Sequence, residues 1–134
     1  MLKELHVQTR AHNEMRIIDS QVQQVVTESG IQEGLCLVWV PHTTAGVTIN
    51  ENADPDVVRD IVYEMDKMVP LRDNYHHMEG NSAGHIKSSL FGPSLTLIVT
   101  GGRLVLGTWQ SIYFCEFDGP RNRRVYVKVV KDVL

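Results

Sequence analysis

Histidines are the residues of this chain whose type and placement could support chemistry. Four of the six lie where loops or helix starts are expected, at His42, His76, His77 and His85. Side chains in such places can be projected from a rigid scaffold toward a ligand. Imidazole binds Zn²⁺ and similar ions, and three imidazoles leave one position open for water or substrate. Because His77 and His85 lack the spacing of an HExxH motif, a metal site and ordinary polar loop histidines both stay open.

Hydroxyl groups and a carboxylate follow the first of these histidines. His42 leads into Thr43 and Thr44, where small neighbouring residues would let the backbone approach an anion or a metal-bound ligand; a plain polar turn is the alternative. Glu51, nine residues on, has no evident structural task and is the better functional candidate. Asp54 instead precedes a proline, a pairing typical of a helix N-cap and first turn.

Groups that could hold an anion occur in the second half of the chain. Asn81 is expected to start a short helix, whose free N–H groups and dipole favour an anion. Arg121, Arg123 and Arg124 follow a predicted turn and could hold phosphate in a bidentate manner, although a solvated hairpin end is the simpler explanation. Gln110 could donate to a ligand. The sequence contains no P-loop, GxGxxG, GxSxG or Ser–His–Asp pattern, so kinase, dinucleotide-dehydrogenase and α/β-hydrolase functions lack support.

Length and composition describe the scaffold that must position these groups. The 134 residues suit one compact domain over 1–134, and 43% are hydrophobic and 22% charged. A formal net charge of -3 argues against a nucleic-acid binder, whose surface must be densely basic. No window approaches the roughly 20 apolar residues of a membrane span, and the N-terminus lacks a signal-peptide pattern, so we expect a cytoplasmic protein without membrane contact. Cys36 and Cys115 lack CxxC spacing and are expected to be buried, reduced thiols.

Apolar periodicity and helix-end signals predict helices and a run of strands. Ser20 with Gln23 fits a capping box for a helix that ends near Gly30. Further helices are expected at 54–69 and 81–90, and the continuous apolar run at 35–40 predicts a strand buried on both faces. Strands are also expected at 2–9, 15–19, 47–50, 94–100, 103–106, 108–117 and 125–130. The predicted class is α+β: a single compact domain with a largely antiparallel sheet or sandwich and two or three helices.

Several motifs together resemble one protein family. They are Ser94-Leu95-Thr96-Leu97-Ile98-Val99 with Gly107-Thr108-Trp109-Gln110, His42-Thr43-Thr44-Ala45, Ile49-Asn50-Glu51-Asn52, Glu79-Gly80-Asn81 with His85-Ile86-Lys87, and Cys115-Glu116-Phe117-Asp118-Gly119-Pro120-Arg121. Over essentially its whole length, the chain resembles the YjbQ family, also called UPF0047. The resemblance implies a compact α+β domain that assembles as a homotrimer.

The same resemblance implies a secondary thiamine-phosphate synthase activity, which joins a hydroxymethylpyrimidine diphosphate to a thiazole phosphate and releases pyrophosphate. The residues that the chain shares with the family are His42, Glu51, His77, Asn81 and His85, with Arg121 nearby in the motifs. We hypothesise that His42, Glu51 and His85 are catalytic, with Glu51 orienting a ligand or water. In the same hypothesis His42, His77 and His85 hold a divalent ion, Zn²⁺ or Mg²⁺, with His76 as the other candidate beside His77. Three imidazoles suit Zn²⁺ better than Mg²⁺, which prefers oxygen ligands. No organic cofactor is expected. Substrate-binding residues would be Thr43, Thr44, Asn81, Lys87, Gln110 and Arg121.

Two other functions could use the same residues. A metal-dependent phosphatase or hydrolase would combine the histidines with an activated water. A non-catalytic module would bind a phosphorylated metabolite and be stabilised by it without turnover. All three functions predict a small phosphorylated metabolite as partner, and none involves nucleic acid or a membrane.

Overall fold

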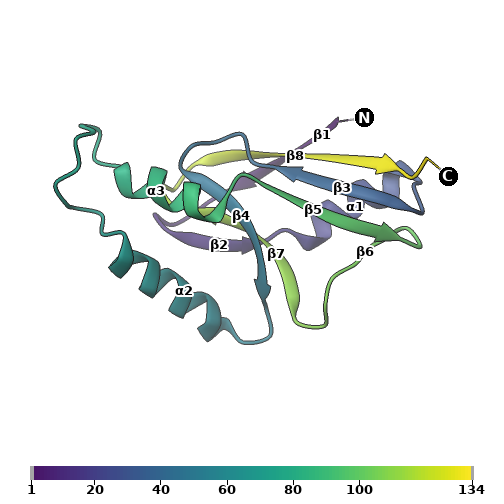
Figure 1. The fold of residues 1–134 in the computed structure, drawn as a ribbon, viewed down its shortest axis with the longest axis horizontal. Helices are drawn as coiled ribbons and strands as arrows, with labels where there is room; N and C mark the ends of the chain where they lie inside the picture. Colours follow the sequence, from purple (N-terminus) through teal and green to yellow (C-terminus); the bar gives the residue numbers. More distant parts are fainter. Residues whose placement is uncertain (1, 134) are drawn as a thin grey trace.

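Eight strands and three helices make up residues 2–133, the part of the chain that the computed structural model describes (Figure 1). None of these helices is long and apolar enough to span a membrane. In chain order the elements are β1 Leu2–Gln8, β2 Glu14–Ile17, α1 Asp19–Ser29, β3 Gly34–Trp39, β4 Ala45–Glu51, α2 Pro55–Met68, α3 Ser82–Phe91, β5 Ser94–Thr100, β6 Arg103–Leu104, β7 Gln110–Glu116 and β8 Asn122–Lys131.

The strands form two antiparallel sheets that share one core. The larger sheet has the order β1-β8-β3-β5-β6, and the smaller has the order β2-β7-β4. Val38 of the larger sheet and Phe114 of the smaller belong to the same buried cluster. Helix α1 adds Val22, Val25 and Val26, which recur at helical spacing and lie on one face. The predicted class, a single compact α+β domain with antiparallel sheets, is confirmed, and the number of helices in the described chain is three.

Burial on both faces occurs in β7 rather than in β3. Every residue of β7 from Ser111 to Glu116 is buried, because the core covers one face while α2 and α3 pack against the other. The prediction of a doubly buried strand at 35–40 is wrong: Leu35, Leu37 and Trp39 are 38–48% exposed, and only the alternate residues face the core. The larger sheet therefore presents an apolar outer face.

Helix-end signals predicted the α2 start and the α1 end correctly, but not the start of α1. The Asp54 carboxylate accepts a hydrogen bond from the Asp56 amide at 2.9 Å and caps α2. Gly30 ends α1 with a left-handed φ of 71°. The predicted capping box of Ser20 and Gln23 is wrong, because α1 already begins at Asp19. The Gln23 side chain instead bonds to backbone groups of the β5–β6 hairpin, at Gly102 and Leu104, so tertiary contacts outweigh the local signal.

Both cysteines have the predicted state. Cys36 and Cys115 are buried and free, each within a core strand. Burial raises the pKa of Cys36 to about 11, so this thiol stays protonated at neutral pH.

Candidate functional site

The N-terminal end of α3 is where most of the predicted site residues meet. A Cβ atom on Gly84, in the first turn of this helix, would lie 2.9 Å from the carbonyl oxygen of Phe117 and 3.4 Å from the Thr44 side chain. Only glycine lets the helix approach the end of β7 and the loop before β4 this closely. One turn further, the Ser88 hydroxyl donates to the Thr43 carbonyl oxygen at 2.6 Å. These contacts fix α3 against the loop at 42–44.

Asp118 links two predicted ligand residues at this helix end. Its Oδ2 accepts hydrogen bonds from Asn81 Nδ2 at 2.9 Å and from Arg121 Nη2 at 3.1 Å. Because the Asn81 side chain turns to Asp118, α3 has no side-chain cap. The Gly84 amide donates to the Asn81 carbonyl oxygen at 3.0 Å, so within the described residues only the first two amides of the helix, those of Ser82 and Ala83, are left to water or to a ligand. Asn81 Oδ1 is buried and has no hydrogen-bond partner among the described residues.

A buried ion pair lies beneath the loop at 42–44. Arg123 Nε donates to Glu116 Oε1 at 2.8 Å, Arg123 Nη2 contacts Oε2, and the same nitrogen donates to Thr44 Oγ1 at 2.9 Å. Burial alone would raise the pKa of Glu116, but hydrogen bonds from Arg123, Thr9 and the Asp118 amide hold this pKa below its usual value. Arg123, a possible phosphate ligand by sequence, is thus engaged in the fold.

His77 and His85 face one another beside α3. Their ring centroids are 5.4 Å apart and the rings are nearly perpendicular, at 88°. The Glu79 carboxylate lies 3.6 Å from His77 Nε2. A surface pocket of about 390 Å³ opens here, and it is lined by Asn74, Tyr75, His76, His77, Ser82, His85 and Ile86. Both neighbouring histidines of the loop thus reach the pocket, and His77 is the one that contacts His85.

His42 has a structural partner of its own. Its Nε2 accepts a hydrogen bond from the Arg124 amide at 2.9 Å. Since β3 has already ended at Trp39, the imidazole takes the acceptor position that a further strand residue would supply to β8. A neutral imidazole that accepts at Nε2 carries its proton on Nδ1. Burial, together with the positive charges of Arg123 and Arg124, lowers the pKa of His42 and favours this neutral form.

Glu51 and Gln110 lie at the opposite end of the smaller sheet from α3. They are paired in register at the end of β4 and the start of β7, and Gln110 Oε1 accepts from the Gly107 amide at 2.8 Å. Glu51 lies six positions beyond Ala45 along β4, a span of about 20 Å. Figure 1 shows β4 running away from α3 over this length. Within one chain, the structure therefore does not bring Glu51 or Gln110 to His85.

Lys87 is held between α3 and α2. Its side chain is buried, and its ammonium contacts the Asp66 carboxylate of α2 and lies 6.0 Å from the centroid of the Phe117 ring. The cation predicted to bind substrate is therefore paired within the protein.

The predicted metal ligands do not gather within one chain. Across residues 2–133, no three His, Cys, Asp or Glu side chains lie close enough together to hold a metal ion. His77 and His85 are neighbours, but His42 uses Nε2 to accept from Arg124. The set of His42, His77 and His85 therefore does not fit a resident ion in the isolated chain, and Zn²⁺ or Mg²⁺ at these histidines stays a prediction.

Two residues that build the site were missed by sequence reasoning. Asp118 holds both Asn81 and Arg121, but in the sequence it looked like part of a turn. Glu116 offered a signal, since it interrupts an apolar segment, and a carboxylate at a buried position must have partners.

Comparison with known proteins gives the family. The family model described as UPF0047 protein YjbQ-like matches residues 3–132. The chain belongs to the UPF0047 (YjbQ-like) family. It is 52% identical over 131 residues to the UPF0047 protein YugU of Bacillus subtilis, covering 97% of this chain and 99% of that protein. A UPF0047 protein of Methanocaldococcus jannaschii is 47% identical over 132 residues, covering 98% and 96% of the two chains.

Two solved structures of similar proteins have the same fold. A YjbQ/UPF0047 protein of Clostridium acetobutylicum has a TM-score of 0.94 at 52% identity, covering 96% of this chain and 99% of its own. A YjbQ-like protein of Sulfolobus solfataricus has the same TM-score of 0.94 at 31% identity, covering 98% and 97%. The family and the fold are thereby established.

Proposed function

We propose that this UPF0047 protein is a transferase of the thiamine-phosphate synthase type, which binds its phosphorylated substrates at the N-terminal end of α3. The observation that carries the proposal is the start of α3, which has no side-chain cap and leaves the Ser82 and Ala83 amides without a partner among the described residues. Arg121 lies on one side of it, and His85 lies one turn along the helix. Helix N–H groups and guanidinium groups both bind phosphate. The buried Asn81 Oδ1 offers an acceptor to an N–H or O–H group of the ligand.

The proposed reaction needs stabilisation of a leaving group. A C–N bond forms between the thiazole nitrogen and the methylene carbon of the pyrimidine. The C–O bond to the diphosphate breaks, and its electron pair leaves with pyrophosphate. Arg121 and the start of α3 stabilise the charge that develops on the leaving oxygens, while His85 donates a hydrogen bond to them. Glu51 lies about 20 Å along β4 from Ala45 and so away from this end of α3 in the same chain, and its catalytic role stays a prediction.

The proposal is tested by thiamine-phosphate formation from the two purified precursors. Wild type, His85→Ala and the matched surface variant His6→Ala are prepared from a host that lacks its own thiamine-phosphate synthase. The His6 side chain is 75% exposed on β1, so its loss leaves the pocket intact. We expect product from wild type and His6→Ala, and none from a correctly folded His85→Ala.

Other outcomes favour different functions. Equal product from all three proteins would mean that the reaction does not take place at the α3 site. If no protein gives product, the transferase proposal fails. Phosphate release from small phosphoesters would then favour a hydrolase, and ligand-induced thermal stabilisation without turnover would favour a binding module.

We propose further that the protein acts as a homotrimer in the cytoplasm. Leu35, Trp39, Ile98 and Val130 give the outer face of the larger sheet a continuous apolar surface, and such surfaces commonly form subunit interfaces. Light scattering should give wild type a molar mass three times that of one chain, and Ile98→Arg the mass of a single chain. The control Tyr63→Arg, on the exposed side of α2, should stay a trimer. A monomeric wild type would refute the proposed assembly.

A further inference from the structure

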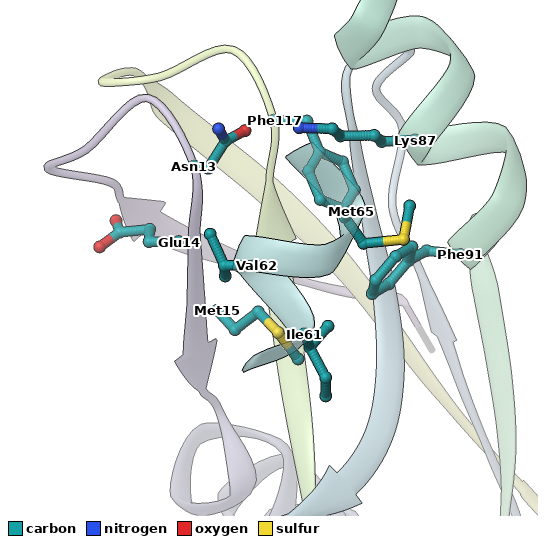
Figure 2. A pocket seen from close by; sticks show the side chains of 9 residues that line it. All are labelled: Asn13, Glu14, Met15, Ile61, Val62, Met65, Lys87, Phe91 and Phe117. Carbon is teal, nitrogen blue, oxygen red and sulfur yellow. The ribbon is translucent and has the colours of Figure 1, made fainter. Parts of the chain in front are cut away.

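Helix α2 is docked more loosely than the other helices of the described chain. None of its side chains is fully buried, whereas α1 and α3 each contribute several buried residues. Its apolar side lies over the outer face of the smaller sheet, where Val58 packs against the cluster of Tyr113, Cys115 and Phe117. A small cavity of about 10 Å³ lies between Ile61, Val62 and Met65 of α2 and the rest of the domain (Figure 2), so apolar packing holds this helix only in part.

Asp66 is the polar link between α2 and the rest of the domain. Its Oδ1 contacts the ammonium of Lys87 in α3 and accepts a hydrogen bond from Asn13 Nδ2, in the β1–β2 turn, at 3.1 Å. Figure 2 shows the Asn13 amide and the Lys87 ammonium pointing toward one another across the top of the pocket. Lys87 is only 3% exposed, whereas the Asp66 side chain is 51% exposed. A buried ammonium needs a counter-charge, so undocking of α2 is opposed chiefly at this one carboxylate.

The loop that follows α2 carries one half of the histidine pair. Residues 69–81 join α2 to α3, and the loop is braced at its start by a hydrogen bond of 2.5 Å from the Tyr75 hydroxyl to the Pro70 carbonyl oxygen. His77 lies in this loop, whereas His85 lies in α3. The distance between the two rings is therefore set by where α2 and α3 lie relative to one another.

We propose that Asp66 is a positioning residue of the α3 site: by pairing with the buried Lys87, it docks α2 and thereby holds His77 against His85. This inference rests on the proposed function only in treating the two histidines as the site. Lys87, predicted to bind substrate, serves the site through Asp66 instead. Undocking of α2 would separate the histidines while leaving the two sheets and α1 intact.

The test compares Asp66→Asn with Asp60→Asn, which removes the same charge from an exposed position of the same helix. Hydrogen exchange of the α2 amides and ¹⁵N resonances of the two imidazoles are measured on the full-length protein. In Asp66→Asn we expect α2 to exchange about tenfold faster or more, the factor for loss of a hydrogen bond to a charged group, while amides of β3 and β8 are unchanged. The His77 and His85 resonances should move together. In Asp60→Asn neither quantity should change.

A second variant guards against a general loss of structure. Lys87→Met removes the buried ammonium, so it should speed exchange of α2 without destabilising the core. The double variant Asp66→Asn/Lys87→Met should exchange within about twofold of Lys87→Met, because the pair has already been lost. Unchanged α2 exchange in Asp66→Asn, or faster exchange without movement of the imidazole resonances, would overturn the proposal. Neither readout uses turnover, so the result is independent of whether the transferase assay succeeds.

Discussion

Replacement of Arg123 has a cost that can be worked out from its contacts. Arg123→Met keeps most of the side-chain length but removes the guanidinium from Glu116 and Thr44. The Glu116 carboxylate would stay fully buried, with hydrogen bonds only from the Thr9 hydroxyl and the Asp118 amide. Removing one partner of a buried ion pair destabilises a protein by about 3–5 kcal/mol. Because two hydrogen bonds to Glu116 remain, we expect the lower end, about 3 kcal/mol.

Urea unfolding measures this loss, with Arg124→Met as the matched control. Arg124 is the next residue along β8, but its side chain is half exposed and its ion pair with Glu4 is 3.6 Å long, so this variant should lose at most about 1 kcal/mol.

The folded-state pKa of Glu116 is lowered in wild type and should be raised in Arg123→Met. Wild type therefore loses stability as the pH falls through that lowered pKa, whereas the variant gains relative stability on protonation. The difference in the free energy of unfolding between wild type and Arg123→Met should therefore shrink from about pH 7 toward about pH 4. A loss below about 1 kcal/mol, or a difference independent of pH, would refute the argument that Arg123 offsets a buried charge.

Three further predictions concern the site itself. Gly84→Ala should destabilise the protein by about 1–3 kcal/mol in urea unfolding, because its Cβ would collide with the Phe117 carbonyl oxygen; a neutral effect would mean that α3 is not held at this contact. NMR titration should give His42 a pKa below its ordinary value of 6.5. The contribution of His42 to stability should be lost as the pH falls from about 6.5 through that lower pKa. A titration midpoint above 6.5 would contradict its role as acceptor toward the Arg124 amide. Added Zn²⁺ should shift the imidazole resonances of His77 and His85 whereas Mg²⁺ should not, because imidazole is a poor ligand for Mg²⁺; equal shifts with both ions, or none with Zn²⁺, would contradict this.

Local signals predicted the elements of the fold well, and tertiary packing explains the errors. Asp54 and Gly30 mark helix ends through groups close to them in sequence. The apolar run at 35–40 predicted a strand but not its exposure, because hydrophobicity does not say whether another layer covers the second face. The side chain of Gln23 bonds to a hairpin about 80 residues away, a partner that no local pattern contains.

The candidate site was predicted in part, for a related reason. Residue types and loop positions identified His77, His85 and Asn81, which do meet at α3. The same reasoning grouped Glu51 with them, but a sequence does not show which end of a strand lies near which helix. Lys87 was named for its charge, and its burial against Asp66 depends on the docking of α2.

The choice of variants for this family follows from how the site is built. Thr44 and Arg121 take part in the same hydrogen-bond network as Glu116, Arg123 and Asp118, and this network joins the ends of β1, β4, β7 and β8. Lost activity after changes in that network would therefore report a displaced loop as readily as a lost ligand contact. The His85 imidazole is different, because among the described residues it makes no hydrogen bond and only the His77 ring packs edge-on against it. Its removal changes the chemistry at the end of α3 while leaving the network in place, so His85 is the position at which loss of function is most informative about the reaction.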